Sequence, residues 1–139
     1  MSILHKPFLA LFAGLISLGS FGFGLEPALA FDCPTSDYEQ IEKRIADAPS
    51  CDTSMQLLMA YQLGSSGDVA LSLIVIKKCE TDFLASLGDR ARRGYERKVG
   101  ACGDQFAGES GTLFQSMRAI CAAEVAHAYA GRAARARKQ

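Results

Sequence analysis

The sequence predicts a small all-α protein, a disulfide-stapled hairpin or bundle of about four helices that follows an N-terminal signal peptide. Three observations lead to this fold class. The chain opens with an apolar leader that ends in a small-residue cleavage motif. All five cysteines lie after that leader, and small exported domains gain much of their stability from disulfides. Helix-start signals and apolar residues at helical spacing recur through the remaining residues.

The first 30 residues have the features of a secretory signal peptide. A short basic start precedes an apolar stretch over residues 7–25, and Ala28-Leu29-Ala30 provides the cleavage motif. We expect cleavage after Ala30, which leaves residues 31–139 as a single small helical domain. The mature protein would then be periplasmic or secreted and would have no membrane association. An uncleaved leader that serves as a membrane anchor is the alternative.

The charge balance argues against a nucleic-acid partner. The chain has 15 basic and 15 acidic residues, and the leader removes one of each sign, Lys6 and Glu26, so the mature part stays balanced. A nucleic-acid-binding domain usually carries a basic excess. Residues 90–98 (RARRGYERK) are locally basic, but their acidic neighbours favour a solvated helix face.

Three segments match the capping box, in which a hydroxyl accepts from a backbone N–H three residues on and a Glu or Gln reaches back. They are residues 36–39, 53–56 and 112–115, and each predicts the start of a helix. Apolar residues then recur at helical spacing: Tyr38, Ile41 and Ile45 in the first helix; Met55, Leu58 and Met59 in the second; Phe114, Met117, Cys121, Val125 and Tyr129 in the last.

A further helix is expected between the second and the last of these. Residues 64–67 (GSSG) predict a turn, after which Asp68 can cap a long helix. That helix would carry Val69, Leu73, Ile76, Phe83, Leu84 and Leu87 on one side. A strand over residues 69–76 is the alternative, but no second strand-like run is present to pair with it. Glycines weaken the continuation, so we expect a kink or break near Gly88.

The cysteine positions predict two disulfides and one free thiol. In a helical hairpin about the GSSG turn, Cys51 and Cys79 lie at similar distances from the turn and therefore level with each other. Cys102 and Cys121 flank the next turn and form the second pair, which stabilises the fold by about 3 kcal/mol. A Cys33–Cys51 pair is disfavoured because the helix between them holds its ends about 18 Å apart. Cys33 is left as the free thiol.

The residues do not form a recognisable catalytic or metal-binding pattern. His127 is the only histidine after the leader, and no Cys-x-x-Cys occurs, so we expect no metal, no cofactor and no enzymatic activity. We expect His127 to be structural or solvent-facing. The carboxylates interleave with basic residues and are expected at solvated helix positions: Glu39, Glu42, Asp47, Glu80, Asp82 and Glu96.

The C-terminal half of the chain resembles the small exported domains named after the LprI lysozyme inhibitor. The resemblance covers about a third of the chain and is carried by Tyr95, Lys98, Cys102, Gly111, Thr112 and Cys121. Tyr95 stands where the family usually has tryptophan, and Lys98-Val99 replaces arginine and aspartate. We read Tyr95, Lys98, Gly111 and Thr112 as structural positions of the motif.

The resemblance implies a helical, disulfide-bonded domain that binds a lysozyme-type muramidase and occludes its sugar cleft. The turn between Cys102 and Cys121 would provide the contacts through Asp104, Phe106, Glu109 and Ser110. A plain polar connection between helices is the alternative interpretation of that turn. The alternative function is a structural or stress-related envelope protein that self-associates or is bridged to another envelope protein through Cys33.

Overall fold

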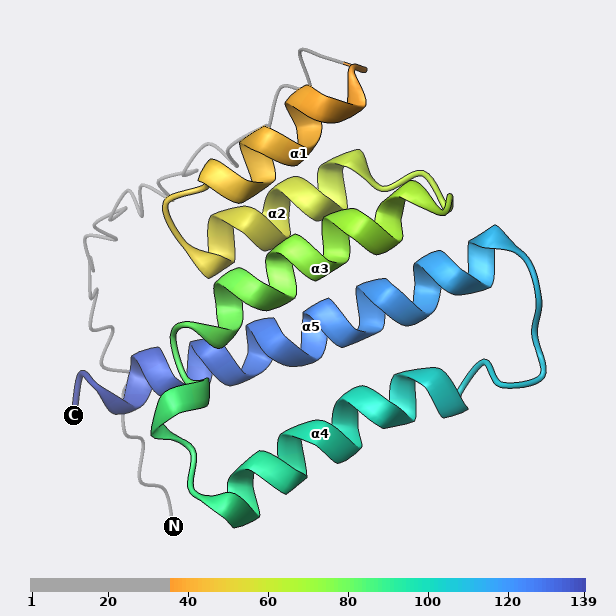
Figure 1. The fold of residues 1–139 in the computed structure, drawn as a ribbon. Coiled ribbons are helices and arrows are strands. Elements are labelled where there is room, and N and C mark those ends of the chain that lie inside the picture. Colours follow the sequence, from red (N-terminus) through yellow and green to blue (C-terminus); the bar gives the residue numbers. More distant parts are fainter. Residues whose placement is uncertain (1–35) are drawn as a thin grey trace, which may run out of the picture. The chain divides into compact units, whose positions relative to one another are not determined.

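The computed structural model describes residues 36–139, which are all-α (Figure 1). The elements are α1 Tyr38–Asp47, α2 Cys51–Tyr61, α3 Gly67–Glu80, a short 3-10 helix η1 Leu84–Ser86, α4 Asp89–Asp104 and α5 Thr112–Ala136. The predicted all-α class is confirmed, with five α-helices where about four were expected. The expected signal peptide and the expected free thiol at Cys33 lie outside the described residues.

The helices form a layered bundle in which α3 and the long α5 make the central contact (Figure 1). α1 and α2 pack on one side of α3, and α4 lies at the opposite edge against α5. Ile45, Leu58 and Val75 are fully buried where α1, α2 and α3 meet. This burial of apolar area is the main favourable contribution to the fold.

Small residues line the face of α5 that meets the core. Its buried positions are Ser116, Ala123, Ala126 and Ala130, and their small side chains let α5 approach α3 closely. The predicted apolar face of α5 was therefore wrong in part. Met117 is exposed, whereas Val125 and Tyr129 are half-buried and pack against the core cluster.

The N-terminal caps of the first two helices lie one and three residues away from their predicted positions. Asp37, not Ser36, caps α1, and its Oδ1 accepts from the N–H of Glu39 at 3.0 Å. Ser50 caps α2 by accepting from the N–H of Thr53 at 3.1 Å. In both places several residues with capping side chains lie close together in sequence, and the sequence pattern alone does not choose among them.

The prediction for the start of α5 was also wrong. Thr112 is the first helical residue and does not cap the helix. The capping position is held by Gly111, whose φ of 102° lies in the left-handed region. Glycine is favoured there because it lacks the Cβ that makes such a backbone conformation costly.

Asp68 holds the α2–α3 turn rather than capping a helix. It lies in the first turn of α3, is 2% exposed, and accepts from the backbone N–H groups of Leu63 and Ser65. Its carboxylate also accepts from the hydroxyl of Ser116 on α5 at 2.6 Å. The turn at GSSG is therefore tied to α5 by a buried, charge-assisted hydrogen bond.

The long helix expected after Asp68 is shorter than predicted. α3 ends at Glu80, and a turn and η1 precede α4, which begins directly after Gly88. Leu73 is exposed, so it does not lie on a buried side. The chain turns because Phe83 enters the core, where its ring centroid lies 5.1 Å from that of Tyr95 and 5.4 Å from that of Tyr129. Residues 69–76 are helical, so the alternative strand is wrong.

Both predicted disulfides are present. Cys51 pairs with Cys79 across the α2–α3 hairpin, with Cα atoms 4.7 Å apart. Cys102 pairs with Cys121 between α4 and α5, with Cα atoms 5.7 Å apart. The first bond lies in the core, and the second fixes the edge helix α4 to the long helix.

Candidate binding site at the α4–α5 loop

The loop between α4 and α5 spans residues 105–111 and is fixed to the bundle from both sides. The Cys102–Cys121 disulfide joins the last turns of α4 to α5 just before the loop begins. Only a few residues separate Cys102 from the loop. A cross-link so close restricts the conformations that the loop can adopt.

Arg118 on α5 contacts the loop backbone. Its guanidinium donates to the backbone carbonyl oxygens of Phe106 and Glu109, the latter at 3.0 Å. No sequence motif marks Arg118, although its position one helical turn before Cys121 places it on the α4-facing side of α5. Arg118 thus forms a clamp on two loop carbonyl oxygens, which would otherwise need water as their hydrogen-bond donor.

Phe106 anchors the loop by packing inward. Its ring centroid lies 6.3 Å from that of Phe114 in the first turn of α5, with the planes tilted by 44°. The side chain is half-buried, so part of the ring is already used within the chain. Only the remainder of Phe106 is available as the partner contact that the sequence predicts.

The other three predicted contact residues are displayed to solvent. Asp104 at the end of α4, Glu109 and Ser110 are all exposed. Neither carboxylate forms an ion pair with any residue from 36 to 139. The structure therefore presents two unpaired acidic groups and one hydroxyl on a loop whose backbone is restrained.

The residues that carry the family resemblance occupy structural positions. Tyr95 is buried and donates to Glu80 Oε1 at 2.8 Å. Its burial, followed by the contact with Glu80, raises the pKa of the Tyr95 hydroxyl. Lys98 is exposed, with its ammonium 6.0 Å from the centre of the Tyr129 ring. Thr112 and Gly111 form the junction of the loop with α5.

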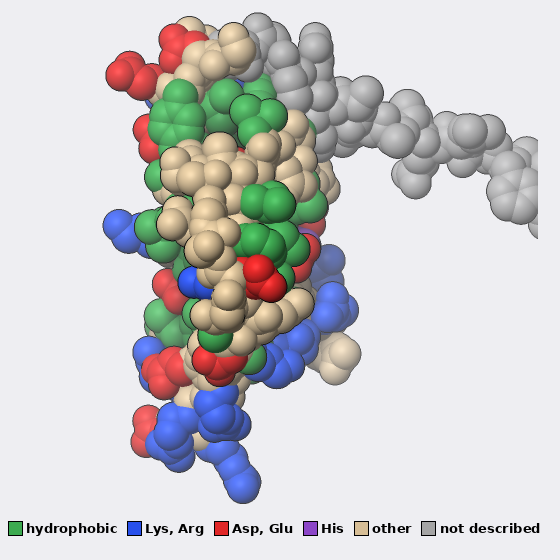
Figure 2. Space-filling model, turned by 90° about the vertical axis from the view of Figure 1, so that its right-hand side faces the viewer, with side chains coloured by type: hydrophobic (Ala, Val, Ile, Leu, Met, Phe, Trp, Pro, Cys, Tyr) green, Lys and Arg blue, Asp and Glu red, His purple; other side chains and the backbone are tan. Residues whose placement is uncertain are grey.

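Exposed apolar side chains lie beside the loop at the same end of the bundle. Leu63 in the α2–α3 turn is 85% exposed and Leu113 on α5 is 53% exposed. Leu113 packs against the backbone at Gly64, which brings these two segments together. Figure 2 looks onto this end and shows hydrophobic side chains among acidic ones in its upper and middle parts.

A second feature joins α2 to α5 near the other end of the bundle. His127 Nε2 lies 2.9 Å from Asp52 Oδ1, and both side chains are partly exposed. The two residues line a shallow groove with Ser50 and Arg137. We interpret this pair as a contact between helices, and the expectation of no enzymatic activity stays a prediction.

Among residues 36–139, no group of three or more His, Cys, Asp or Glu side chains is arranged to hold a metal ion. No helix in this part of the chain is long and apolar enough to span a bilayer. Comparison with known proteins finds no matching family model, no matching curated protein and no matching solved structure. The resemblance to LprI-type domains therefore stays a prediction from the residues that carry it.

Proposed function

We propose that this protein is an exported binding protein whose α4–α5 loop occludes the sugar cleft of a basic, lysozyme-type muramidase. The fold is a small helical domain with two disulfides, which is typical of proteins that mature in an oxidising environment outside the cytosol. The resemblance to LprI-type domains supplies the partner class. The geometry of the loop supplies the mechanism.

The observation that carries the proposal is a restrained backbone with exposed polar side chains. The Cys102–Cys121 disulfide, the Arg118 clamp and the inward Phe106 ring all restrict residues 105–111. A loop that is already ordered loses less conformational entropy when it enters a cleft, so more of the contact energy appears as affinity.

The charge of the loop suits a basic partner. Asp104 and Glu109 form no ion pair within residues 36–139, and the guanidinium of Arg118 donates to loop carbonyl oxygens rather than to either carboxylate. Exposed charges of this kind mainly raise the association rate constant, and this effect decreases as the salt concentration rises because ions screen the charges. Inhibition is therefore expected to weaken with increasing ionic strength.

A muramidase assay tests this function directly. Titrating the oxidised protein into a basic muramidase should slow hydrolysis of peptidoglycan. The variant with both Asp104→Asn and Glu109→Gln should inhibit about tenfold more weakly. The matched control, Asp89→Asn with Glu96→Gln, removes two exposed carboxylates from α4 away from the loop and should inhibit as well as the parent. Unchanged hydrolysis at large excess of the parent, or equal loss in both variants, would show the proposal to be wrong.

A further inference from the structure

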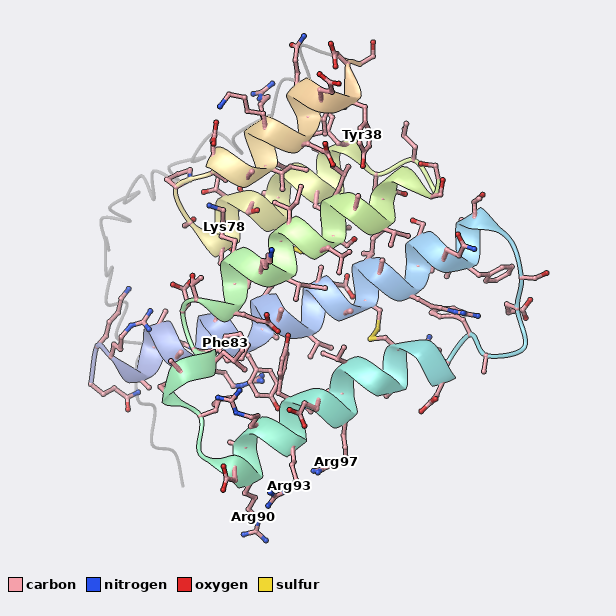
Figure 3. All side chains as sticks on the ribbon, viewed as in Figure 1. Tyr38, Lys78, Phe83, Arg90, Arg93 and Arg97 are labelled. Atoms are coloured by element: carbon pink, nitrogen blue, oxygen red, sulfur yellow. A yellow bond between two sulfur atoms is a disulfide. The ribbon has the colours of Figure 1, made fainter. Side chains whose placement is uncertain are left out.

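α4 is an edge helix with one face inside the bundle and one face free. Tyr95 and Cys102 are its buried residues and face α5. The opposite face is directed away from every other described helix (Figure 3). Any residues that recur on that outer face are available to a partner.

Three arginines recur on this outer face. Arg90, Arg93 and Arg97 have the spacing of neighbours on one side of a helix, and they span about 10 Å along its axis. All three are exposed, and none forms an ion pair or side-chain hydrogen bond with a described residue. Figure 3 shows all three side chains pointing away from the bundle. We call these three residues the arginine ridge.

The neighbouring basic residues of α4 are used inside the chain, unlike the ridge. Arg92 is half-buried and donates to the carbonyl oxygen of Leu84 at 2.9 Å, and Lys98 lies over the Tyr129 ring. Asp89 and Glu96 are exposed acidic neighbours of the ridge, and Gly100 and the exposed Ala101 follow it on the same helix with little or no side chain. All three guanidinium groups can therefore reach one flat surface together.

The positive surface also extends beyond the ridge. α4 and α5 run antiparallel, with the Tyr95 and Tyr129 rings 5.1 Å apart, so the start of α4 and the end of α5 lie at the same end of the bundle. That end carries the exposed Arg135 on α5 and the exposed Lys138 just after the helix. Figure 2 shows lysine and arginine side chains gathered along its lower edge, where α4 lies. The basic region is thus spread over two helices rather than along one line.

From this arrangement we infer that the arginine ridge binds the phosphate headgroups of an anionic phospholipid surface. Guanidinium groups pair with phosphate oxygens in a bidentate manner. A convex ridge at the edge of a bundle fits a plane, because all three side chains meet it at once. Asp104 at the other end of α4 is repelled by the same surface, so α4 tilts and holds the α4–α5 loop away from the lipid. This inference is independent of the proposed muramidase binding, and it replaces the expectation that the mature protein has no membrane association.

Vesicle binding tests the inference. The oxidised protein should sediment with vesicles made of equal parts phosphatidylglycerol and phosphatidylcholine, and not with phosphatidylcholine alone. The binding should weaken as salt rises. Each ridge arginine contributes about fivefold to the partition constant, so the triple variant Arg90→Gln, Arg93→Gln and Arg97→Gln should bind about a hundredfold more weakly.

A matched variant separates the ridge from total charge. Lys43→Gln with Lys77→Gln removes two charges from exposed positions on α1 and α3, away from the ridge, and should lower binding by less than about fivefold. The double ridge variant Arg93→Gln with Arg97→Gln removes the same charge and should bind about 25-fold more weakly. Circular dichroism should show the same helical content for both double variants. An equal loss in the two variants, or equal binding of the ridge variant and the parent, overturns the inference. Equal affinity for soluble polyphosphate at the same phosphate concentration overturns the choice of a membrane.

Discussion

Two buried serines should respond in opposite directions when each is replaced by alanine. Ser116 on α5 is 1% exposed and donates to the buried Asp68 carboxylate at 2.6 Å. Ser72 on α3 is 0% exposed, and its hydroxyl has no hydrogen-bond partner among residues 36–139. Both substitutions place alanine in a helix interior, so the gain in helix propensity cancels when the two variants are compared.

The magnitude follows from these contacts. Ser116→Ala removes a hydrogen bond to a buried charged group, which contributes about 1.5–3 kcal/mol. Ser72→Ala removes a buried hydroxyl without a partner and should be neutral or slightly stabilising. We therefore expect Ser116→Ala to have a free energy of unfolding about 2 kcal/mol below that of Ser72→Ala. For a domain of about this size the difference corresponds to a melting temperature lower by roughly 8–16 °C.

Urea unfolding followed by circular dichroism, with both disulfides intact, measures this difference. Repeating the pair in an Asp68→Ala background, which removes the acceptor of the Ser116 hydrogen bond, completes a double-mutant cycle, and most of the difference should disappear there. If the free energies of unfolding of Ser116→Ala and Ser72→Ala differ by less than about 0.5 kcal/mol, the Asp68–Ser116 contact does not stabilise the α2–α3 turn against α5. The reasoning from buried hydrogen bonds would then be refuted.

Three further predictions concern stability. Replacing both Cys102 and Cys121 by serine should lower the free energy of unfolding by about 3 kcal/mol, and an unchanged urea midpoint would contradict the cross-link's role. Gly111→Ala should lower the free energy of unfolding by about 1–3 kcal/mol, because the φ of Gly111 is 102°. The matched variant Gly108→Ala has open space for its Cβ and no positive φ, so its free energy of unfolding should lie within about 0.5 kcal/mol of that of the parent. The pKa of Tyr95 is raised in the fold, so the contribution of Tyr95 to the free energy of unfolding is complete below pH 10.0, the ordinary tyrosine value, and is lost as the pH rises above it. The free energy of unfolding of Tyr95→Phe should therefore fall less than that of the parent over this alkaline range. The same fall in both proteins would contradict this reasoning.

Much of the functional interpretation depends on side chains that become neighbours only in the folded chain. The exposure of Asp104, Glu109 and Ser110 agrees with their expected place on a polar turn. Arg118, which restrains that turn, was missed because its acceptors are backbone carbonyls, and carbonyls leave no signal in a sequence. Phe106 packs part of its ring against Phe114, a contact that its sequence position did not indicate, and its role as a partner contact stays a prediction.

The sequence by itself determined the helical class, the hairpin about residues 64–67 and both disulfide pairs. These features follow from local periodicity and from the constant rise of a helix, which brings Cys51 level with Cys79 across a short turn. Only the tertiary structure decided which face of α5 is buried, where α3 ends and what Asp68 does. Ala126, Phe83 and Asp68 each meet residues far away in the chain, and the free energy of such contacts depends on packing between helices that no local pattern records.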